Sequence, residues 1–200
     1  MIIGLTGQSG AGKSTVSCTL SKQEGFAVID CDKIAKLVTQ DGSPCNEEIK
    51  KHFPEAVSDE LILDRQKMAG IVFSSKSRLK EYEGIIYPYI TQAVYDMISQ
   101  YSSCGYGVII LDAPTLFEAG IDFICDMVIG VIADKEIRKA RIRQRDSISD
   151  EMIEKRFSSQ RDDAFFKERC ELIIVNDSDE AKLSGEINNI INKIRTMVNG

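Results

Sequence analysis

A glycine-rich segment close to the start of the chain constrains the fold more than any other feature. The residues from Gly7 to Thr15 read Gly-Gln-Ser-Gly-Ala-Gly-Lys-Ser-Thr and match the pattern G-x-x-x-x-G-K-[ST] completely. Glycines allow such a loop to turn its backbone N–H groups inward, where they bind phosphate oxygens. An apolar run before the loop, and Val16 and Leu20 at helical spacing after it, supply the expected strand and helix. The segment therefore predicts a P-loop that binds the phosphates of a nucleotide.

The residues of this loop have distinct expected roles. Lys13 places a positive charge near the β- and γ-phosphates and is a catalytic candidate, and the Ser14 hydroxyl is the candidate ligand for Mg2+. The positive end of the following helix also favours phosphate. We expect ATP and Mg2+ as cofactors, with ATP contacted by Gly10, Ala11, Gly12, Lys13, Ser14 and Thr15.

Five short apolar runs, each bounded by turn residues, alternate with longer amphipathic stretches. Their near-continuous hydrophobicity is typical of strands that are covered on both faces. The alternation predicts an α/β fold, here the P-loop NTPase fold with a five-stranded parallel sheet flanked by helices. The predicted strands are 2–6, 26–29, 107–111, 127–132 and 172–175. One face of a C-terminal helix is marked by Ile187, Ile190, Ile191, Ile194 and Val198.

Composition narrows the classes of partner. The formal net charge of -6 gives no general attraction for phosphate backbones, so we expect no nucleic acid partner. The six cysteines form no C-x-x-C pair, and His52 is the only histidine, so reduced cysteines are favoured over a zinc site or a disulfide framework. The sequence contains no membrane-length apolar run and no signal-peptide pattern. We expect a soluble, cytoplasmic protein with no membrane partner.

Other classes of P-loop protein carry sequence motifs that this chain lacks. A GTPase needs N-K-x-D, but Asn192-Lys-Ile-Arg195 lacks the aspartate and falls inside the last predicted helix. A D-x-x-G switch is also missing, because the chain reads Asp112-Ala-Pro-Thr115 after the third strand. A motor or a large ATPase would need a longer chain. A small kinase remains, with a core sheet, a helical substrate-binding insertion and an arginine-bearing lid.

Two intervals between strands are too long for simple connections. The first contains helical patterns at 47–53, 65–73 and 90–101, and the second is a charged helical stretch at 149–167. We interpret residues 1–200 as one P-loop kinase domain. Its predicted parts are a core of 1–31, 106–146 and 168–200, an acceptor-binding insertion at about 32–105, and a lid at about 147–167.

Two aspartates follow the second strand, at the edge where open α/β sheets bind ligands. Asp30 and Asp32 could point the same way from an extended segment, toward the γ-phosphate. One could accept the proton of an acceptor hydroxyl while the other holds water on Mg2+. Alternatively, Asp32 caps a helix over residues 33–39.

Three arginines share one face of the helix after the fourth strand: Arg138, Arg141 and Arg145. One interpretation is a solvated basic face. The other is a lid that swings onto the phosphates, which the neighbouring insertion favours. Arginine suits that role because its planar fork binds phosphate oxygens bidentately and stays charged.

An ordered set of segments resembles the dephospho-CoA kinase family. The segments are Gly4-Leu-Thr-Gly7, Val28-Ile-Asp-Cys-Asp-Lys-Ile-Ala-Lys36, Leu63-Asp-Arg65 with Gly70-Ile-Val-Phe73, and Asp112-Ala-Pro-Thr-Leu-Phe-Glu-Ala-Gly120. The lid and final strand carry further matches at Arg141, Arg145-Asp146, Gln160 and Asn176. The resemblance implies ATP-dependent phosphorylation of the ribose 3′-hydroxyl of dephospho-CoA, the last step of CoA synthesis. The small-molecule partner would be dephospho-CoA, and we expect a monomer or a weak homo-oligomer.

The resemblance also implies roles for single residues. Asp32 is similar to the aspartate that receives the acceptor proton, and Asp30 would support it or the metal shell. Arg141 and Arg145 would act catalytically by neutralising the transferring phosphoryl group. Asn176 lies near where the family holds adenine. The acceptor pocket would be shaped by Asp32 together with Arg65, Pro114 and Leu116.

Two positions on the acceptor side depart from the family's pattern. Tyr87-Pro88 stands where the family usually has His-Pro, and Thr115 where it usually has leucine. His52 matches no motif and is expected to be a surface or packing residue. Two alternatives stay open: a nucleoside or nucleoside-monophosphate kinase, and a non-catalytic nucleotide-binding module. The motifs after the second and third strands argue against the first, and the intact phosphate-binding residues argue against the second.

Overall fold

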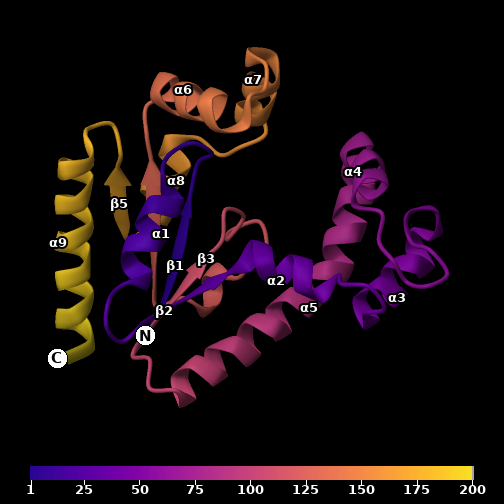
Figure 1. Ribbon diagram of the computed structural model, residues 1–200, viewed down its shortest axis with the longest axis horizontal. Helices are drawn as coiled ribbons and strands as arrows, with labels where there is room; N and C mark the ends of the chain where they lie inside the picture. Colours follow the sequence, from indigo (N-terminus) through magenta and orange to yellow (C-terminus); the bar gives the residue numbers. More distant parts are fainter. Residues whose placement is uncertain (200) are drawn as a thin grey trace. The chain divides into compact units, whose positions relative to one another are not determined.

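The computed structural model describes residues 1–199, and these contain one five-stranded sheet (Figure 1). The strands are β1 (Ile2–Gly7), β2 (Phe26–Asp30), β3 (Val108–Asp112), β4 (Met127–Ile132) and β5 (Leu172–Val175). Their order across the sheet is β2-β3-β1-β4-β5. β1 pairs in parallel with β3 and with β4, and β4 pairs in parallel with β5. The five predicted strands are confirmed, with ends that agree within one residue.

The centre of the sheet forms the hydrophobic core. Ile3 and Leu5 of β1 and Ile129 of β4 are fully buried. Burial of each such side chain contributes on the order of 1.5–3 kcal/mol. Because both faces of these strands are covered, their sequences show no alternation with polar residues.

Helices α1 (Lys13–Ser21) and α9 (Glu180–Asn199) pack against each other and join the core of the sheet. Their apolar residues in this core include Val16, Leu20, Ile187, Ile191 and Ile194. The predicted apolar face of α9 is therefore confirmed except at Val198, which is 43% exposed. Val198 lies near Gly107, the residue before β3, at the side of an open hollow.

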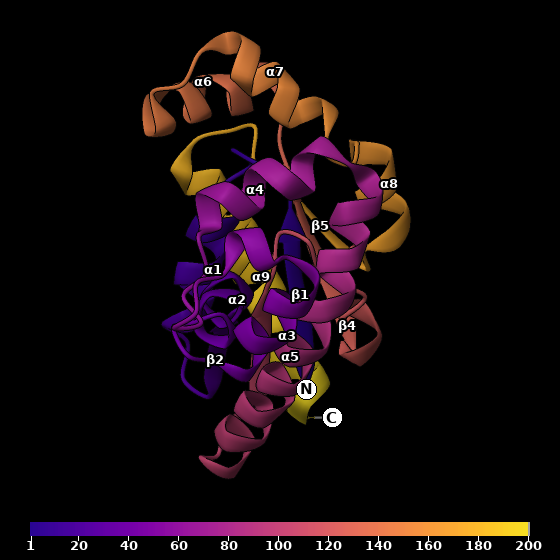
Figure 2. The same cartoon turned by 90° about the vertical axis from the view of Figure 1, so that its right-hand side faces the viewer.

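The remaining helical segments follow the strands or lie in the two long connections. They are α2 (Cys31–Val38), α3 (Pro44–His52), η1 (Pro54–Ala56), α4 (Arg65–Ser74), α5 (Lys76–Ser103), η2 (Asp122–Ile124), α6 (Lys135–Asp146), α7 (Asp150–Ser158) and α8 (Asp163–Arg169). Figures 1 and 2 show α6 and α7 side by side beyond the carboxyl end of β4, whereas α8 contacts β4 and β5. The predicted lid range of 147–167 thus includes α7 and most of a helix that packs on the sheet. Across residues 1–199, no helix combines the length and apolarity needed to cross a bilayer.

The chain divides into two compact units. The sheet unit comprises residues 1–28 and the chain from 101 onward, and the helical unit comprises residues 29–100. In the helical unit, buried Phe53 meets Tyr82 edge-on at 6.0 Å between ring centroids, and the Arg78 guanidinium lies 4.0 Å above its ring. Buried Asn46 donates to three backbone carbonyls and ties neighbouring loops together.

Several helices differ from their predicted bounds: α3 starts three residues before the predicted range 47–53, and the stretch predicted at 149–167 forms two helices, α7 and α8. Residues 76–103 form one helix, α5, which contains Pro88, whereas the prediction began at residue 90. Proline lacks an N–H and normally marks a helix boundary, so the sequence pattern hid the first half of α5. Helix α2 begins at Cys31, two residues before the predicted start, because the Asp30 side chain accepts a hydrogen bond from the Lys33 N–H.

Candidate active site

The start of α1 differs from most other helix starts in this protein. Within residues 1–199, seven helices begin on an aspartate or serine whose side chain accepts a backbone N–H: Asp30, Ser43, Asp64, Asp134, Ser149, Asp162 and Asp179. Helix α1 begins on Gly12, with no side-chain cap and no acidic residue in its first turn. Its first N–H groups and its positive dipole end are therefore available to an anion.

The loop before α1 requires its glycines. Gly10 has φ +80° and Gly12 has φ +96°, both in the left-handed region. A Cβ at Gly10 would lie 2.8 Å from the backbone oxygen of Arg138, and a Cβ at Gly12 would collide with the Asn176 amide. The Ala11 N–H donates to Gln8 O at 3.0 Å and closes the turn. The predicted loop therefore has the conformation of a phosphate-binding nest.

The remaining loop residues start the helix. The Thr15 N–H donates to Gly12 O at 3.0 Å. The side chains of Ser14 and Thr15 are exposed on the first turn of α1. The Ser14 hydroxyl is thus accessible for a metal ion at the position where the sequence predicted one.

Lys13 forms an ion pair with Asp112, the last residue of β3. Only 15% of the Lys13 side chain and 12% of the Asp112 side chain are exposed. In the sheet register Asp112 lies beside Leu5 of β1. The Asp112 carboxylate is therefore close to the loop that follows β1. Asp112 was not among the predicted site residues. The available signal was an aspartate that ends the apolar run from Val108, a pattern that places a carboxylate beside the metal in P-loop proteins.

Two of the predicted site residues meet behind the loop. Arg141 of α6 donates to Gly10 O and to Asn176 Oδ1, both at 3.4 Å. Asn176, which follows β5, donates from Nδ2 to Ala11 O at 2.8 Å and is 5% exposed. Both side chains therefore bind the carbonyl side of the loop in this structure.

The other two arginines of the predicted basic face, Arg138 and Arg145, have different surroundings. Arg145 donates to Asp146 at 2.7 Å, and Arg156 of α7 donates to the same carboxylate at 2.5 Å. These hydrogen bonds, that of Arg145 first, hold the pKa of Asp146 well below its ordinary value. Arg138 is buried, donates from Nε to Ala133 O at 2.9 Å and lies 4.5 Å above the Phe157 ring. Arg138 therefore fits neither of the two interpretations offered for the basic face.

The loop between α7 and α8 also reaches the phosphate-binding loop. Gln160 Oε1 accepts the Ser9 N–H at 3.2 Å. Gln8 donates from Nε2 to Asp163 at 2.8 Å and to the Arg161 carbonyl at 3.3 Å. The segment predicted as part of a lid is thus connected to the loop through two amide side chains.

The two aspartates after β2 do not share an extended segment, and that part of the prediction is wrong. Asp30 is the cap of α2: its Oδ1 accepts the Lys33 N–H at 3.0 Å, and its Oδ2 lies 3.2 Å from Lys33 Nζ. Asp32 lies in the first turn of the helix. The cap predicted as the alternative role of Asp32 therefore belongs to Asp30, because a cap must precede the first helical residue.

The other acceptor-side candidates have structural contacts of their own. Arg65, at the start of α4, donates to Thr39 Oγ1 at 2.7 Å and to the Lys36 carbonyl at 3.3 Å. The Pro114 carbonyl accepts the Thr6 hydroxyl at 3.2 Å. Leu116 is fully buried against Gly4 of β1.

His52 and Tyr87 belong to the helical unit. His52 Nδ1 lies 3.0 Å from Glu81 and thereby links α3 to α5. Tyr87 donates its hydroxyl to Glu83 at 3.1 Å, one turn earlier on α5.

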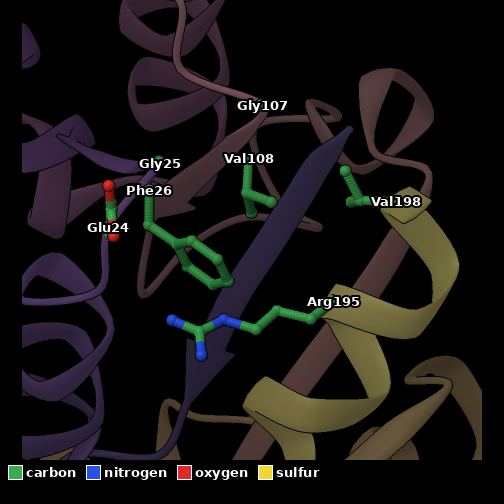
Figure 3. A pocket seen from close by; sticks show the side chains of 7 residues that line it. All are labelled: Glu24, Gly25, Phe26, Gly107, Val108, Arg195 and Val198. Atoms are coloured by element: carbon green, nitrogen blue, oxygen red, sulfur yellow. The ribbon is translucent and has the colours of Figure 1, made fainter.

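A hollow of about 350 Å³ lies at the opposite end of the sheet (Figure 3). It is lined at the amino ends of β2 and β3 by Phe26 and Val108, and on α9 by Arg195 and Val198. Arg195 donates to Gln23 at 3.2 Å. Open parallel sheets bind ligands at the carboxyl ends of their strands. The hollow therefore lies at the end of the strands away from the loop after β1, where a ligand of an open parallel sheet is not expected.

Mg2+ fits the residues at the loop. Among residues 1–199, no three His, Cys, Asp or Glu side chains are grouped so that they could hold a metal ion. Nucleotide-bound Mg2+ needs no such cage, because phosphates and waters supply most of its ligands. The accessible Ser14 hydroxyl and the Asp112 carboxylate beside Lys13 match that requirement.

Comparison with known proteins identifies the family. A family model described as dephospho-CoA kinase matches residues 1–182. The chain belongs to the dephospho-CoA kinase family. The dephospho-CoA kinase of Fusobacterium nucleatum is 40% identical over 179 residues, which cover 89% of this chain and 90% of that one. The predicted resemblance is confirmed.

Solved structures agree with this assignment. The crystal structure of TT1252 from Thermus thermophilus matches with a TM-score of 0.83 and 28% identity, over 100% of this chain and 98% of that one. Dephospho-CoA kinase from Campylobacter jejuni matches with a TM-score of 0.70 and 27% identity, over 96% of both chains. The predicted P-loop kinase fold is confirmed.

Proposed function

We propose that this kinase transfers the γ-phosphoryl group of ATP to the ribose 3′-hydroxyl of dephospho-CoA and so produces CoA. The observation that carries the proposal is the uncapped start of α1 beside Lys13, in a chain that belongs to this family along most of its length. An uncapped helix start with an adjacent lysine binds the phosphates of a nucleotide.

Within this proposal, the loop from Gly10 to Thr15 holds the phosphates of ATP. Lys13 exchanges its partner Asp112 for phosphate oxygens, and the released carboxylate, together with the Ser14 hydroxyl, becomes available to a metal ion. These two groups would hold Mg2+, which when bound neutralises charge on the β- and γ-phosphates. Asp30 supports the metal shell or Asp32.

The acceptor is bound by the helical unit. Asp32 accepts the proton of the 3′-hydroxyl and orients its oxygen toward the γ-phosphorus. Arg65, Pro114 and Leu116 shape the pocket, Leu116 from its buried position and Arg65 by holding α2 to α4. Tyr87 and Thr115, which depart from the family's usual residues, tune the affinity for the acceptor.

The arginines complete the site. Arg141 donates to the Gly10 carbonyl, and in this proposal its side chain leaves that carbonyl to contact the transferring phosphoryl group. Arg145 lies further along α6 and is released from Asp146 when the lid closes. Closure excludes water and limits hydrolysis of ATP.

The direct test is to incubate the protein with Mg-ATP and dephospho-CoA and to weigh the products by mass spectrometry. The expected product is heavier by one phosphate, located at the ribose 3′ position. Nucleosides and nucleoside monophosphates serve as competing acceptors in parallel reactions. Phosphorylation of these acceptors alone would identify a nucleoside-type kinase, and ATP binding without transfer to any acceptor would identify a binding module.

The cellular setting follows from the same proposal. We expect the protein in the cytoplasm, acting on a small molecule as a monomer or a weak homo-oligomer. Sedimentation equilibrium with and without ATP tests the oligomeric state. A tight dimer in both conditions would contradict it.

A further inference from the structure

Asn176 forms hydrogen bonds inside the protein with its backbone N–H and with both ends of its side-chain amide. Its backbone N–H donates to Ile132 O at 2.9 Å, its Nδ2 donates to Ala11 O at 2.8 Å, and its Oδ1 accepts from Arg141 at 3.4 Å. The side chain is 5% exposed. One N–H and one lone pair of the amide take no part in these bonds, but because the residue is buried they are poorly accessible to an adenine base.

The orientation of this amide follows from its partners. The guanidinium of Arg141 can only donate, and the carbonyl of Ala11 can only accept. Oδ1 must therefore face Arg141 and Nδ2 must face the loop. Because Asn176 directly follows β5, which pairs with β4 beside β1, the parallel sheet sets where the amide stands.

The bond to Ala11 O determines where the next N–H points. The carbonyl of Ala11 and the N–H of Gly12 belong to one planar trans peptide unit, so they point in opposite directions. When Asn176 holds the carbonyl on the outer side of the loop, the Gly12 N–H is directed to the inner side. That side is the concave face on which a nest binds phosphate oxygens.

The packing around Gly12 supports the same role. Gly12 is in the left-handed region at φ +96°, and a Cβ at this position would collide with Asn176 Nδ2. The amide of Asn176 thus lies directly against the loop and limits the conformations that Gly12 can adopt. Arg141, through its bond to Gly10 O, restrains the preceding peptide unit in the same way.

We propose that Asn176 is a positioning residue that sets the phosphate-binding conformation of the loop by aiming the Gly12 N–H, and that it does not read the adenine base. The proposal deepens the proposed function, because it takes the loop as the ATP phosphate site. It differs from what the family resemblance implies, which places Asn176 near adenine.

Asn176→Asp is the informative variant. Aspartate keeps the size and the acceptor for Arg141, but it presents a carboxylate oxygen to the Ala11 carbonyl and loses the donor. We expect affinity for the phosphates to fall on the order of tenfold, the worth of one buried hydrogen bond replaced by repulsion. Asn188→Asp, on the exposed side of α9, makes the same charge change and is the matched control.

Isothermal titration calorimetry with ATP, GTP and inorganic tripolyphosphate separates phosphate positioning from base reading. In Asn176→Asp, the affinities for ATP and for tripolyphosphate should fall by the same factor, and the ratio of the ATP affinity to the GTP affinity should stay unchanged. In steady-state assays KM for ATP should rise while KM for dephospho-CoA stays constant. Unchanged tripolyphosphate affinity with a weakened preference for ATP would overturn the proposal, and so would unchanged affinity for all three.

A measurement on the wild-type protein keeps the test valid if the variant fails to fold. The side-chain NH2 signals of Asn176 in NMR spectra should respond equally to tripolyphosphate and to ATP. A response to ATP alone would show a base contact and refute the positioning role. The calorimetric and NMR measurements do not use the acceptor, so a failure of dephospho-CoA as substrate would remove only the KM comparison and leave their outcome intact.

Discussion

The first two helices both begin where a parallel strand ends, yet their starts have opposite chemistry. Helix α1 begins on Gly12, without a side-chain cap and without an acidic residue in its first turn. Helix α2 begins on Asp30, which occupies an N–H of the first turn, and carries Asp32 in that turn. An open positive helix end binds phosphate, whereas a capped and acidic one disfavours it.

The two starts show separate effects. The sheet topology places both helix starts at the ends of strands, and the residue at each start determines which kind of ligand can bind there. A loop that leaves its amides open suits the triphosphate donor. A first turn with two carboxylates suits a neutral hydroxyl, which needs an acceptor for its proton. The predictions below test whether these two helix starts divide the reaction in this way.

The largest effect is expected at the start of α1. Lys13→Ala removes the positive charge beside the open amides, and we expect turnover to fall by roughly 10³ or more, with weaker ATP binding. The rate and the ATP affinity are measured by coupled assay and calorimetry. Lys22→Ala, on the exposed end of the same helix, should behave like the wild-type protein. Normal ATP affinity and rate in Lys13→Ala would mean that the phosphates bind elsewhere.

The next effect is expected at the start of α2. Asp32→Asn keeps the size of the side chain and removes its basicity, so turnover should fall by roughly 10² with ATP affinity nearly intact. Asp41→Asn, in an exposed turn of the same unit, is the control. Near-normal turnover in Asp32→Asn would remove this residue from the role of proton acceptor.

Variants of Asp30 can separate its role as a helix cap from a role of its charge in supporting Mg2+. Asparagine caps helices as well as aspartate does, so Asp30→Asn should unfold in urea like the wild type. Asp30→Ala should lower the free energy of unfolding by about 1 kcal/mol. If the charge supports Mg2+, Asp30→Asn should need several-fold more Mg2+ for half-maximal rate. An unchanged Mg2+ requirement would limit Asp30 to capping.

The smallest effect concerns the far end of a helix. Asp146 lies at the C-terminal end of α6, where a negative charge is unfavourable, and Arg145 and Arg156 offset it. Because the pKa of Asp146 in the folded state is below its ordinary value of 3.8, the pairing stabilises the fold above that pH and is lost as pH falls.

Thermal unfolding at two pH values checks this expectation. Asp146→Asn should melt a few degrees below the wild type at pH 7, and the difference should shrink toward zero as the pH drops below about 4. A difference that persists at pH 3 would point to packing rather than charge.

The parallel sheet and the phosphate loop were predictable because their signals are local and contiguous. Buried strands such as β1 and β4 appear as unbroken apolar runs, and the loop appears as one ordered motif. Helix α5 was half hidden because Pro88 resembles a boundary, although the turns on both sides continue the helix. The start of α2 was predicted two residues too late, because the cap formed by Asp30 depends on the orientation of one side chain.

The candidate site was predictable only in part, for the same reason. Lys13 and Ser14 belong to the motif, so their neighbourhood was evident. Asp112 and Asn176 stand 99 and 165 residues away from their partners Lys13 and Ala11, and strand pairing brings them there. Arg138 was grouped with Arg141 by helical spacing, but the packing of α6 turns it into the interior.

The amino-acid sequence by itself determined the strands, the helix-opening glycine loop, and the membership of a kinase family. These features depend on residue type and spacing along one continuous segment. Burial and backbone geometry act on such a segment locally, so its sequence is enough to predict them. The tertiary structure alone decided that Asp112 pairs with Lys13, and that Asn176 and Arg141 support the loop from behind. Those contacts exist because parallel strands align the ends of distant segments, and no local pattern encodes which ends will meet.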